Sequence, residues 1–540
     1  MNCISNVKLI SSLEKIYDND SMPLKDFKSF SMLKNEKKSF QIVIEADNEG
    51  KAELKINSDF SKYELYSVEH VKSDLPMADK DADDYYRFSE SGYYPDLLLP
   101  VQGEAVEFKK GINVFWVELF GKAASVGLHK IEVNIEDFVV NVEVDVIDAE
   151  LDFNDFVYTC WFHSDCLMSY YNFDAFSDEY WRVVENFLKT AVDYGMTCVL
   201  TPIFTPPLDT EIGKERPTVQ LVDITLKDGK YSFNFDKLTR WIEMAERCGI
   251  RYFELSHLYT QWGARHAPKI MARVDGEYKR IFGWDTKANS KKYRQFLADF
   301  AKEITKYFED KGINDRVFIH VSDEPSTFVI PKYSRASKHI HKIFKGYRII
   351  DALSDYLFYK LKIVSNPIPA NDHIDRFLGN VDDLWTYYCS GQRKHYVSNR
   401  FFCNESLRTR VIGYQLFKYD IRGFLQWGYN FYYTQLSKGL IDPFKVTDAG
   451  GKFPSGDSFI VYPAADGTAY HSLRLKVFYD GLQDMAALNT LKKLSNKKTC
   501  IDIIEENGKF DLTFRNYPHD SEWLLDTREE INKRIKEIKG

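Results

Sequence analysis

The sequence lacks long hydrophobic runs. None of its 540 residues begins a stretch of about 18 uninterrupted apolar residues, which excludes a membrane-spanning helix. The N-terminal segment MNCISNVKLISSLEKIYDND contains no apolar core of a signal peptide. We therefore expect a soluble, cytoplasmic protein, or a secreted one only if a leader peptide has been removed.

Basic runs, paired cysteines and nucleotide-binding motifs are also missing. The 72 basic and 80 acidic residues give a net charge of -8 with no basic patch, so we expect no nucleic-acid partner. The 8 cysteines include no CxxC pair, which favours reduced thiols over a disulfide framework or a zinc site. No GxGxxG or Walker motif opens a helix in the right setting, and no GxSxG is present. We expect no cofactor.

Aromatic residues are abundant instead. They make up 15% of the chain, with 34 Tyr, 39 Phe and 9 Trp, which is more ring surface than a core needs. Rings with a polar group are typical of pockets that hold the flat apolar faces of sugars. The length also requires more than one hydrophobic core.

The first part of the chain, residues 1–150, alternates short β-type segments with turn residues. The segments SFQIVIEA, INVFWVELF, HKIEVNI and FVVNVEVDVID show the period-2 pattern of half-buried strands. This density of short strands predicts an antiparallel β-sandwich domain. Between them, about Lys72–Gly103 is rich in Asp, Tyr and Pro and is predicted to form a long loop.

Residues 151–500 repeat apolar strand, polar loop and amphipathic helix, which predicts a (β/α)8 TIM barrel. The expected strands are Val157–Phe162, Met196–Pro202, Arg251–Ser256, Val317–Ser322, Tyr347–Ile350, Lys362–Ser365, Asp383–Tyr388 and Gly423–Tyr429. The clearest expected helices are Ser177–Tyr194, Phe235–Cys248, Lys291–Lys311, Glu405–Tyr419 and Ala469–Leu494. Residues 501–540 are expected to form a C-terminal extension that ends in a charged helix packed on the barrel.

Active sites of such barrels lie at the C-terminal ends of the strands. The sharpest signal there is the segment RVFIHVSDEP, in which Asp323 and Glu324 follow an apolar strand and precede Pro325. Side chains alternate along a strand, so a bend is needed to turn both carboxylates the same way, and the proline supplies it. The alternative interpretation is a solvated turn or a helix cap.

Hydrolysis of an acetal requires a protonated acid at the leaving oxygen and a negative or dipolar partner for the oxocarbenium-like carbon, and two neighbouring carboxylates can divide these roles. Adjacent residues are too close in sequence to flank a sugar as the opposed nucleophile and acid of the usual retaining pair. They suit a reaction in which the 2-acetamido oxygen of the substrate attacks the anomeric carbon. Asp323 would then steady the amide N–H, and Glu324 would protonate the leaving group.

The sequence resembles glycoside hydrolase family 123, the β-N-acetylgalactosaminidases. The resemblance rests on CWFHSDCL at Cys160–Leu167, HVSDEP at His320–Pro325 and RGFLQWGYNFY at Arg422–Tyr432, together with a β-sandwich ahead of a barrel. It implies substrate-assisted, retaining hydrolysis with Asp323 orienting the acetamido group and Glu324 as acid and base. The family 20 hexosaminidases use the same arrangement.

Further polar and aromatic residues at the strand ends are candidates for binding the substrate. They are Trp161, His163, His257, Trp385, Tyr387, Trp427, Tyr429 and Asn430. For each of them a packing role in the barrel is the alternative. A catalytic metal is not expected, because HxH and HExxH spacings are absent around His163, Asp165, His257, His320 and Asp323.

Two classes of function are therefore open. The first is an exo-acting β-N-acetylgalactosaminidase that acts on the ends of glycans or glycosphingolipids, with a β-N-acetylglucosaminidase as the alternative among enzymes. The second is a non-catalytic carbohydrate-binding protein. The paired acid at a strand end favours the enzyme, and the oligomeric state stays open.

Overall fold

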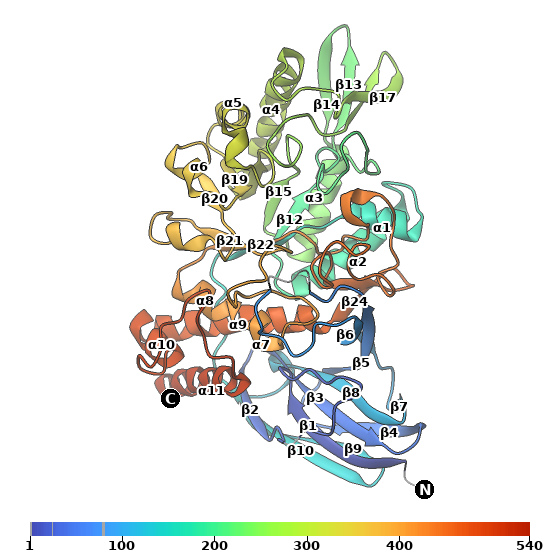
Figure 1. Cartoon of the computed structure of the whole chain (residues 1–540), viewed down its shortest axis with the longest axis vertical. Coiled ribbons are helices and arrows are strands. Elements are labelled where there is room, and N and C mark those ends of the chain that lie inside the picture. The colour runs from blue at the N-terminus through green and yellow to red at the C-terminus, as the bar shows by residue number, and fades with distance from the viewer. Residues whose placement is uncertain (1–2, 24, 78–81) are drawn as a thin grey trace.

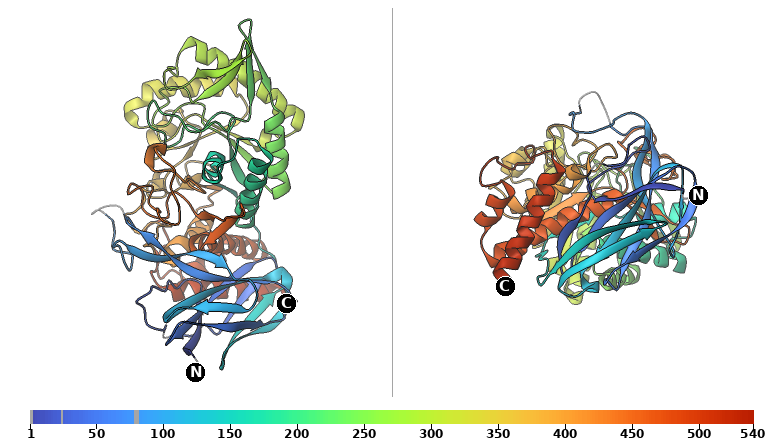
Figure 2. Two further views of the ribbon diagram at one scale, coloured as in Figure 1. Left: turned by 90° about the vertical axis from the view of Figure 1, so that its right-hand side faces the viewer. Right: turned by 90° about the horizontal axis from the view of Figure 1, so that it is seen from below.

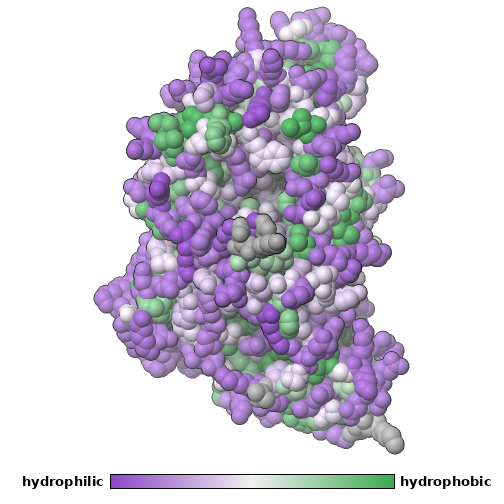
Figure 3. Space-filling model, viewed as in Figure 1, coloured by the Kyte–Doolittle hydropathy of each residue, from purple (hydrophilic) through white to green (hydrophobic). Residues whose placement is uncertain are grey.

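The computed structural model describes residues 3–23, 25–77 and 82–540. The molecule has two parts stacked along its long axis, a β-sandwich at one end and a parallel β-barrel at the other, and both termini lie at the sandwich end (Figures 1 and 2). The face seen in Figure 3 is mostly hydrophilic, with apolar patches on its upper, barrel half.

The sandwich consists of two sheets. The larger contains β1 (Ile4–Ser11), β3 (Lys37–Ala46), β8 (Gly111–Phe120), β5 (Tyr63–Ser73), β6 (Gly92–Pro100), β24 (Ala469–Ser472) and β23 (Val461–Pro463), in this order. The smaller contains β2 (Ser29–Leu33), β10 (Phe138–Ile147), β9 (Gly127–Ile135), β4 (Gly50–Asn57) and β7 (Ala105–Phe108). The pairings are antiparallel except that of β2 with β10. Alternating side chains such as Val142, Val144 and Val146 are fully buried between the sheets, as the period-2 pattern predicts.

Two sequence expectations in this part are wrong. Within the expected loop Lys72–Gly103, Gly92–Pro100 forms β6 and pairs with β5, and Leu97 and Leu98 of this strand are buried. The start of the expected helix Ala469–Leu494 is strand β24, which pairs with β6, and the helix begins only at Leu473. The helix start is set by Ser472, whose hydroxyl caps it by accepting the Leu475 N–H.

Eight parallel strands form a nearly closed barrel. They are β20 (Asn366–Ile368), β19 (Arg348–Ala352), β18 (Val317–His320), β15 (Tyr252–Leu255), β12 (Cys198–Thr201), β11 (Val157–Cys160), β22 (Gly423–Gln426) and β21 (Trp385–Tyr387), in spatial order. A parallel bridge between Ala370 and Tyr387 joins the two edges. Seven strands lie where the sequence predicts them.

The sixth strand is Asn366–Ile368 and not Lys362–Ser365. The apolar pair Ile363 and Val364 is buried in the turn after helix α6 (Tyr356–Lys360), so hydrophobicity alone marked the wrong segment. Asn366 begins β20 and therefore lies at the N-terminal end of this strand, away from the C-terminal ends where barrel active sites lie.

Helices surround the barrel. They are α1 (Ser164–Tyr171), α2 (Asp178–Asp193), α3 (Asp236–Cys248), α4 (Lys291–Lys311), α5 (Ile330–Ile343), α6, α7 (Ser406–Arg410) and α8 (Ile412–Lys418). Serines at the N-caps of α2 and α4, Ser177 and Ser290, each accept a backbone N–H, and left-handed Gly249 and Gly312 end α3 and α4. Because these capping residues are recognisable in the sequence, the bounds of α2, α3 and α4 lie close to the predicted ones.

One small sheet above the barrel has no counterpart in the sequence expectations. It contains β14 (Lys230–Asn234), β13 (Asp223–Lys227), β16 (Ile270–Val274) and β17 (Glu277–Phe282), and it lies at the top of Figure 1. The 3-10 helices are η1 (Gly121–Ala123), η2 (Asn314–Arg316), η3 (Thr327–Val329), η4 (Ile374–Arg376) and η5 (Gln435–Ser437).

Helix α9 (Leu473–Leu494) crosses the junction between sandwich and barrel (Figure 1). Its Asp484 forms buried ion pairs with Arg410 of the barrel, at 2.7 Å, and with Arg528, at 3.2 Å. Arg528 also pairs with Glu36 of the sandwich at 2.8 Å. Arg528 belongs to α11 (Ser521–Lys539), which follows α10 (Lys497–Ile504) and contacts α9, α10 and β2. Within the described chain, no helix is long and apolar enough to cross a membrane.

Candidate active site

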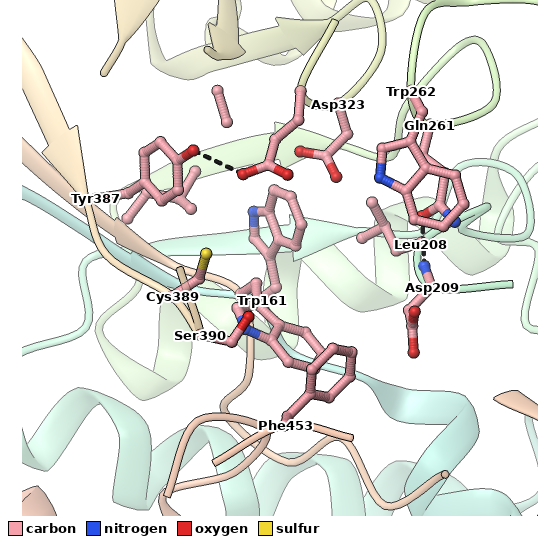
Figure 4. A pocket seen from close by; sticks show the side chains of 14 residues that line it. Trp161, Leu208, Asp209, Gln261, Trp262, Asp323, Tyr387, Cys389, Ser390 and Phe453 are labelled. Carbon is pink, nitrogen blue, oxygen red and sulfur yellow. Dashed lines mark hydrogen bonds between the residues drawn. The ribbon is translucent and has the colours of Figure 1, made fainter. Parts of the chain in front are cut away.

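A cavity opens at the C-terminal ends of the barrel strands. Its volume is about 130 Å³, and it is open to solvent at its mouth. Every barrel strand except β20, or the loop after it, contributes to the wall (Figure 4). The lining residues are Trp161, Leu208, Asp209, Gln261, Trp262, Asp323, Glu324, Ala352, Tyr387, Cys389, Ser390, Leu425, Trp427 and Phe453.

Asp323 and Glu324 both line this cavity, in the loop after β18. Glu324 has a left-handed backbone with a φ of 41°, which is uncommon for a residue with a side chain and costs about 1 kcal/mol or more. Neighbouring loops hold the pair in place. The Glu324 N–H donates to the Ala352 carbonyl at 3.0 Å, and the Trp262 N–H donates to the Asp323 carbonyl at 2.8 Å. The bend therefore turns adjacent carboxylates toward one space.

Tyr387, at the end of β21, contacts the acid pair directly. Its hydroxyl donates a hydrogen bond of 2.6 Å to Glu324 Oε1, drawn in Figure 4. Burial and the Glu324 carboxylate raise the pKa of Tyr387 well above its usual value. The phenol thus stays protonated and can donate to Glu324 or to a ligand.

The surroundings of Asp323 change the pKa of its carboxyl group. Burial, and then the charge of Glu324, raises the pKa of Asp323 well above its usual value. Asp323 therefore retains its proton to a higher pH than an isolated carboxyl would. One acid and one carboxylate can then coexist at the same end of the cavity.

Aromatic side chains form much of the remaining wall. In Figure 4 the ring of Trp161 lies beneath the Asp323 carboxylate, and Trp262 lies beside it. Trp427 is oriented by a 3.0 Å hydrogen bond from its Nε1 to buried Asp457 and by edge-to-face contact with Phe453 at 5.2 Å. Such rings present apolar faces of the kind that pack against a sugar.

Comparison with known proteins identifies the family. The model of the glycoside hydrolase 123 catalytic domain matches residues 161–491, which is more than half of the chain. The chain belongs to glycoside hydrolase family 123. This confirms the resemblance seen in the sequence and makes the protein a glycoside hydrolase.

Solved structures agree on the fold. A family 123 glycoside hydrolase from Clostridium perfringens, described for its hydrolysis of glycolipid glycans, is 15% identical, with a TM-score of 0.73 and coverage of 98% of this chain and 97% of that one. A family 5 mannosidase from Rhizomucor miehei is 11% identical, with a TM-score of 0.31 and coverage of 65% and 95%, too low to inform the function. No curated protein matches the sequence.

Five of the ten site residues predicted from the sequence of this family 123 enzyme line the cavity. They are Asp323, Glu324, Trp161, Tyr387 and Trp427. Their roles with substrate stay predictions, but their positions fit those roles.

The other five candidates do not line the cavity and have packing partners instead. Nε2–H of His163 donates to the Trp427 carbonyl, and its Nδ1 accepts from Arg216. The Asn430 side chain accepts the His163 N–H and donates to the His163 carbonyl. His257 stacks on His320, Trp385 packs against Phe318, and the Tyr429 hydroxyl donates to the Phe187 carbonyl. All five are buried, and burial lowers the pKa of both histidines, so they are neutral. These side chains do not support the predicted direct contacts with the sugar.

Several lining residues were missed because they lie beyond the strand ends. Leu208 and Asp209 follow the segment TPIFTPP after β12, Gln261 and Trp262 belong to the loop after β15, and Phe453 comes from the long segment after β22. Only the two prolines before Leu208 hint at a fixed loop. Burial raises the pKa of Asp209 to about 6, and its Oδ2 accepts the Leu436 N–H at 2.8 Å.

The side chains considered for a metal site have other partners. Asp165 forms a buried ion pair with Arg216 at 2.7 Å, and His320 contacts Glu254. Throughout the described ranges, no group of three or more His, Cys, Asp or Glu side chains is placed to hold a metal ion.

Proposed function

We propose that this family 123 glycoside hydrolase is an exo-acting, retaining β-N-acetylgalactosaminidase that works by substrate-assisted catalysis on the ends of glycans or glycosphingolipids. The observation that carries the proposal is the adjacent pair Asp323 and Glu324, turned into one cavity by the bend after β18, with Tyr387 bonded to Glu324. This arrangement supplies an acid and a carboxylate on the same side of a bound sugar.

In the first step, the acetamido oxygen of the substrate attacks the anomeric carbon while Glu324 gives its proton to the departing glycosidic oxygen. Positive charge develops on the acetamido nitrogen as the oxazoline ring closes. Asp323 accepts the N–H there and stabilises that charge more in the transition state than in the ground state. Both side chains line the same cavity, so both can reach one substrate.

In the second step, Glu324, now a carboxylate, takes a proton from a water molecule that opens the oxazoline at the anomeric carbon. Two inversions give net retention, and no bond forms between sugar and protein. Tyr387 can stabilise the carboxylate form of Glu324 through the hydrogen bond already present, or bind the acetamido carbonyl.

The choice of sugar rests on the family and on the cavity. A cavity walled by tryptophan rings presents the apolar faces that suit a sugar residue at a chain end. The Clostridium perfringens relative is described as hydrolysing glycolipid glycans, which supports that substrate class. N-Acetylglucosamine is the alternative, because it differs only in the orientation of one hydroxyl.

Turnover of chromogenic glycosides tests the proposal. We expect hydrolysis of the aryl β-N-acetylgalactosaminide with a kcat/KM well above that of the N-acetylglucosaminide. A reversed preference would assign a glucosaminidase. Saturable binding of N-acetylgalactosamine without release of the chromophore would instead indicate a carbohydrate-binding protein.

Asp209 offers a sharp test of the mechanism, because it is a third carboxylate in the cavity wall. If the substrate supplies the nucleophile, Asp209 acts only as a hydrogen-bond acceptor for a hydroxyl. Asp209→Asn should then lower kcat/KM by about 10- to 150-fold, the value of a hydrogen bond to a charged group. Steady-state kinetics, with binding of the free sugar as the control, measure this.

A loss of turnover in Asp209→Asn as large as that from removing the catalytic acid would contradict this role. It would identify Asp209 as the nucleophile of a two-carboxylate mechanism. Glu254 and Asp351, at the third and fifth strand ends, are less suitable, because both are fully buried and neither lines the cavity.

A further inference from the structure

A cluster of polar side chains lies inside the barrel next to the floor of the cavity. It comprises Glu254, His320 and Asp351 at neighbouring strands, with Thr159 on β11 and Tyr333 on α5. All five side chains are inaccessible to solvent. Burying such groups is costly unless each is paired, and apolar residues of the same size would fill the space more cheaply. The cluster therefore calls for a reason beyond packing.

Glu254 is the centre of the cluster. Its Oε1 accepts the indole N–H of Trp161 at 2.7 Å, and its Oε2 accepts the Thr159 hydroxyl at 2.6 Å. Oε1 also contacts Nε2 of His320 in an ion pair. Trp161 is the one member of this network that reaches the cavity, where its ring lies beneath Asp323 (Figure 4).

The charge state of His320 strengthens this attachment. Burial disfavours its charged form, but the carboxylates of Glu254 and Asp351 outweigh burial and raise the pKa of His320 to about 9. Nδ1 of His320 lies 3.9 Å from Asp351, whose other oxygen accepts the Tyr333 hydroxyl. His257 stacks on the imidazole with ring centres 4.2 Å apart. The histidine is thus fixed from several sides and holds Glu254 in turn.

We propose that Glu254, held by His320 and Thr159, is a positioning residue of the active site that sets the tilt of the Trp161 ring beneath the sugar. It touches no substrate and acts only through the indole N–H. The proposal rests on the proposed function in one respect, namely that the cavity binds a sugar. Because a displacement of about 1 Å can lower a rate about 100-fold, fixing this ring matters for catalysis as well as for binding.

A double-mutant cycle tests this. Glu254→Met keeps the volume but removes the acceptor, and we expect a 10- to 100-fold loss in kcat/KM. Glu254→Gln keeps an acceptor for the indole N–H. Its loss in log kcat/KM should therefore be at most half of that of Glu254→Met. In a Trp161→Phe background, which has no indole N–H, Glu254→Met should change kcat/KM by less than about threefold, because coupled residues are not additive.

Asp96→Asn is the matched control, since Asp96 forms a buried ion pair with Arg474 at 2.7 Å and neither residue lines the cavity. It should lower the melting temperature without changing KM. If Glu254→Met does not fold, Thr159→Val, which removes only the 2.6 Å hydrogen bond to Glu254, replaces it with an expected three- to tenfold loss.

Equal losses from Glu254→Met in the wild-type and Trp161→Phe backgrounds would overturn the proposal, as would losses that merely follow melting temperature. The cycle uses whichever aryl glycoside the wild type hydrolyses. A wrong sugar assignment would show as a different substrate preference of the wild type, and the test of Glu254 would still be valid.

Discussion

Glu324→Gln is expected to abolish hydrolysis of natural oligosaccharides while sparing much of the turnover of aryl glycosides with good leaving groups. The amide cannot supply a proton to the departing oxygen, and general acid catalysis contributes roughly 100- to 10,000-fold. An aryl leaving group departs without that proton. The ratio of kcat/KM for the two substrate types, compared with that of the wild type, measures the effect.

The matched control is Glu405→Gln, a change at a half-buried glutamate outside the cavity lining. It should leave the ratio of the two substrates unchanged. An equal loss on both substrates in Glu324→Gln would assign Glu324 a role other than that of the acid.

Asp323→Asn is expected to lower kcat by about 100- to 1,000-fold with little change in KM. The carboxylate stabilises positive charge that exists only as the oxazoline forms, and removing one such stabilising group has effects of this size. The variant should also show a shift in its pH profile. Burial and then the charge of Glu324 raise the pKa of Asp323, and the reaction needs its carboxylate form. Wild-type kcat/KM should therefore fall as the pH drops through this raised pKa, and Asp323→Asn should lack that acid limb.

Steady-state kinetics over a range of pH, with circular dichroism to verify folding, provide both readouts. Full turnover in Asp323→Asn would make Asp323 structural. An acid limb that is unchanged in the variant, together with a large rise in KM, would assign Asp323 to ground-state binding.

Local sequence signals predicted most of the barrel. Strands β11, β12, β15 and β18 are short apolar runs bounded by polar loops. Helix α4 begins after a serine N-cap and ends before a glycine, so its capping residues mark the same bounds as its hydrophobic pattern. The predicted bounds are wrong where apolar residues are buried outside a barrel strand or where a strand forms by pairing with a distant segment. Ile363 and Val364 are buried in a turn, and β24 is fixed by pairing with β6, nearly four hundred residues away in the chain.

The site shows the same division. Asp323 and Glu324 could be found because a strand, an acid pair and a proline follow one another in sequence. His257 and Tyr429 follow strand ends in the sequence and were therefore candidates for binding the sugar. In the structure their side chains are buried, because His257 stacks on His320 and the Tyr429 hydroxyl donates to the Phe187 carbonyl. Trp262 and Phe453 reach the cavity from loops whose paths depend on tertiary hydrogen bonds, such as that of the Trp262 N–H with Asp323. No local pattern encodes such paths.

The inhibition constant of a thiazoline analogue of N-acetylgalactosamine tests the substrate-assisted mechanism most directly. The analogue copies the bicyclic oxazoline but does not open, and an enzyme binds the high-energy species of its reaction far more tightly than the substrate. The account predicts that the thiazoline inhibits at least about 100-fold more tightly than free N-acetylgalactosamine. A thiazoline that binds no better than the free sugar would contradict it.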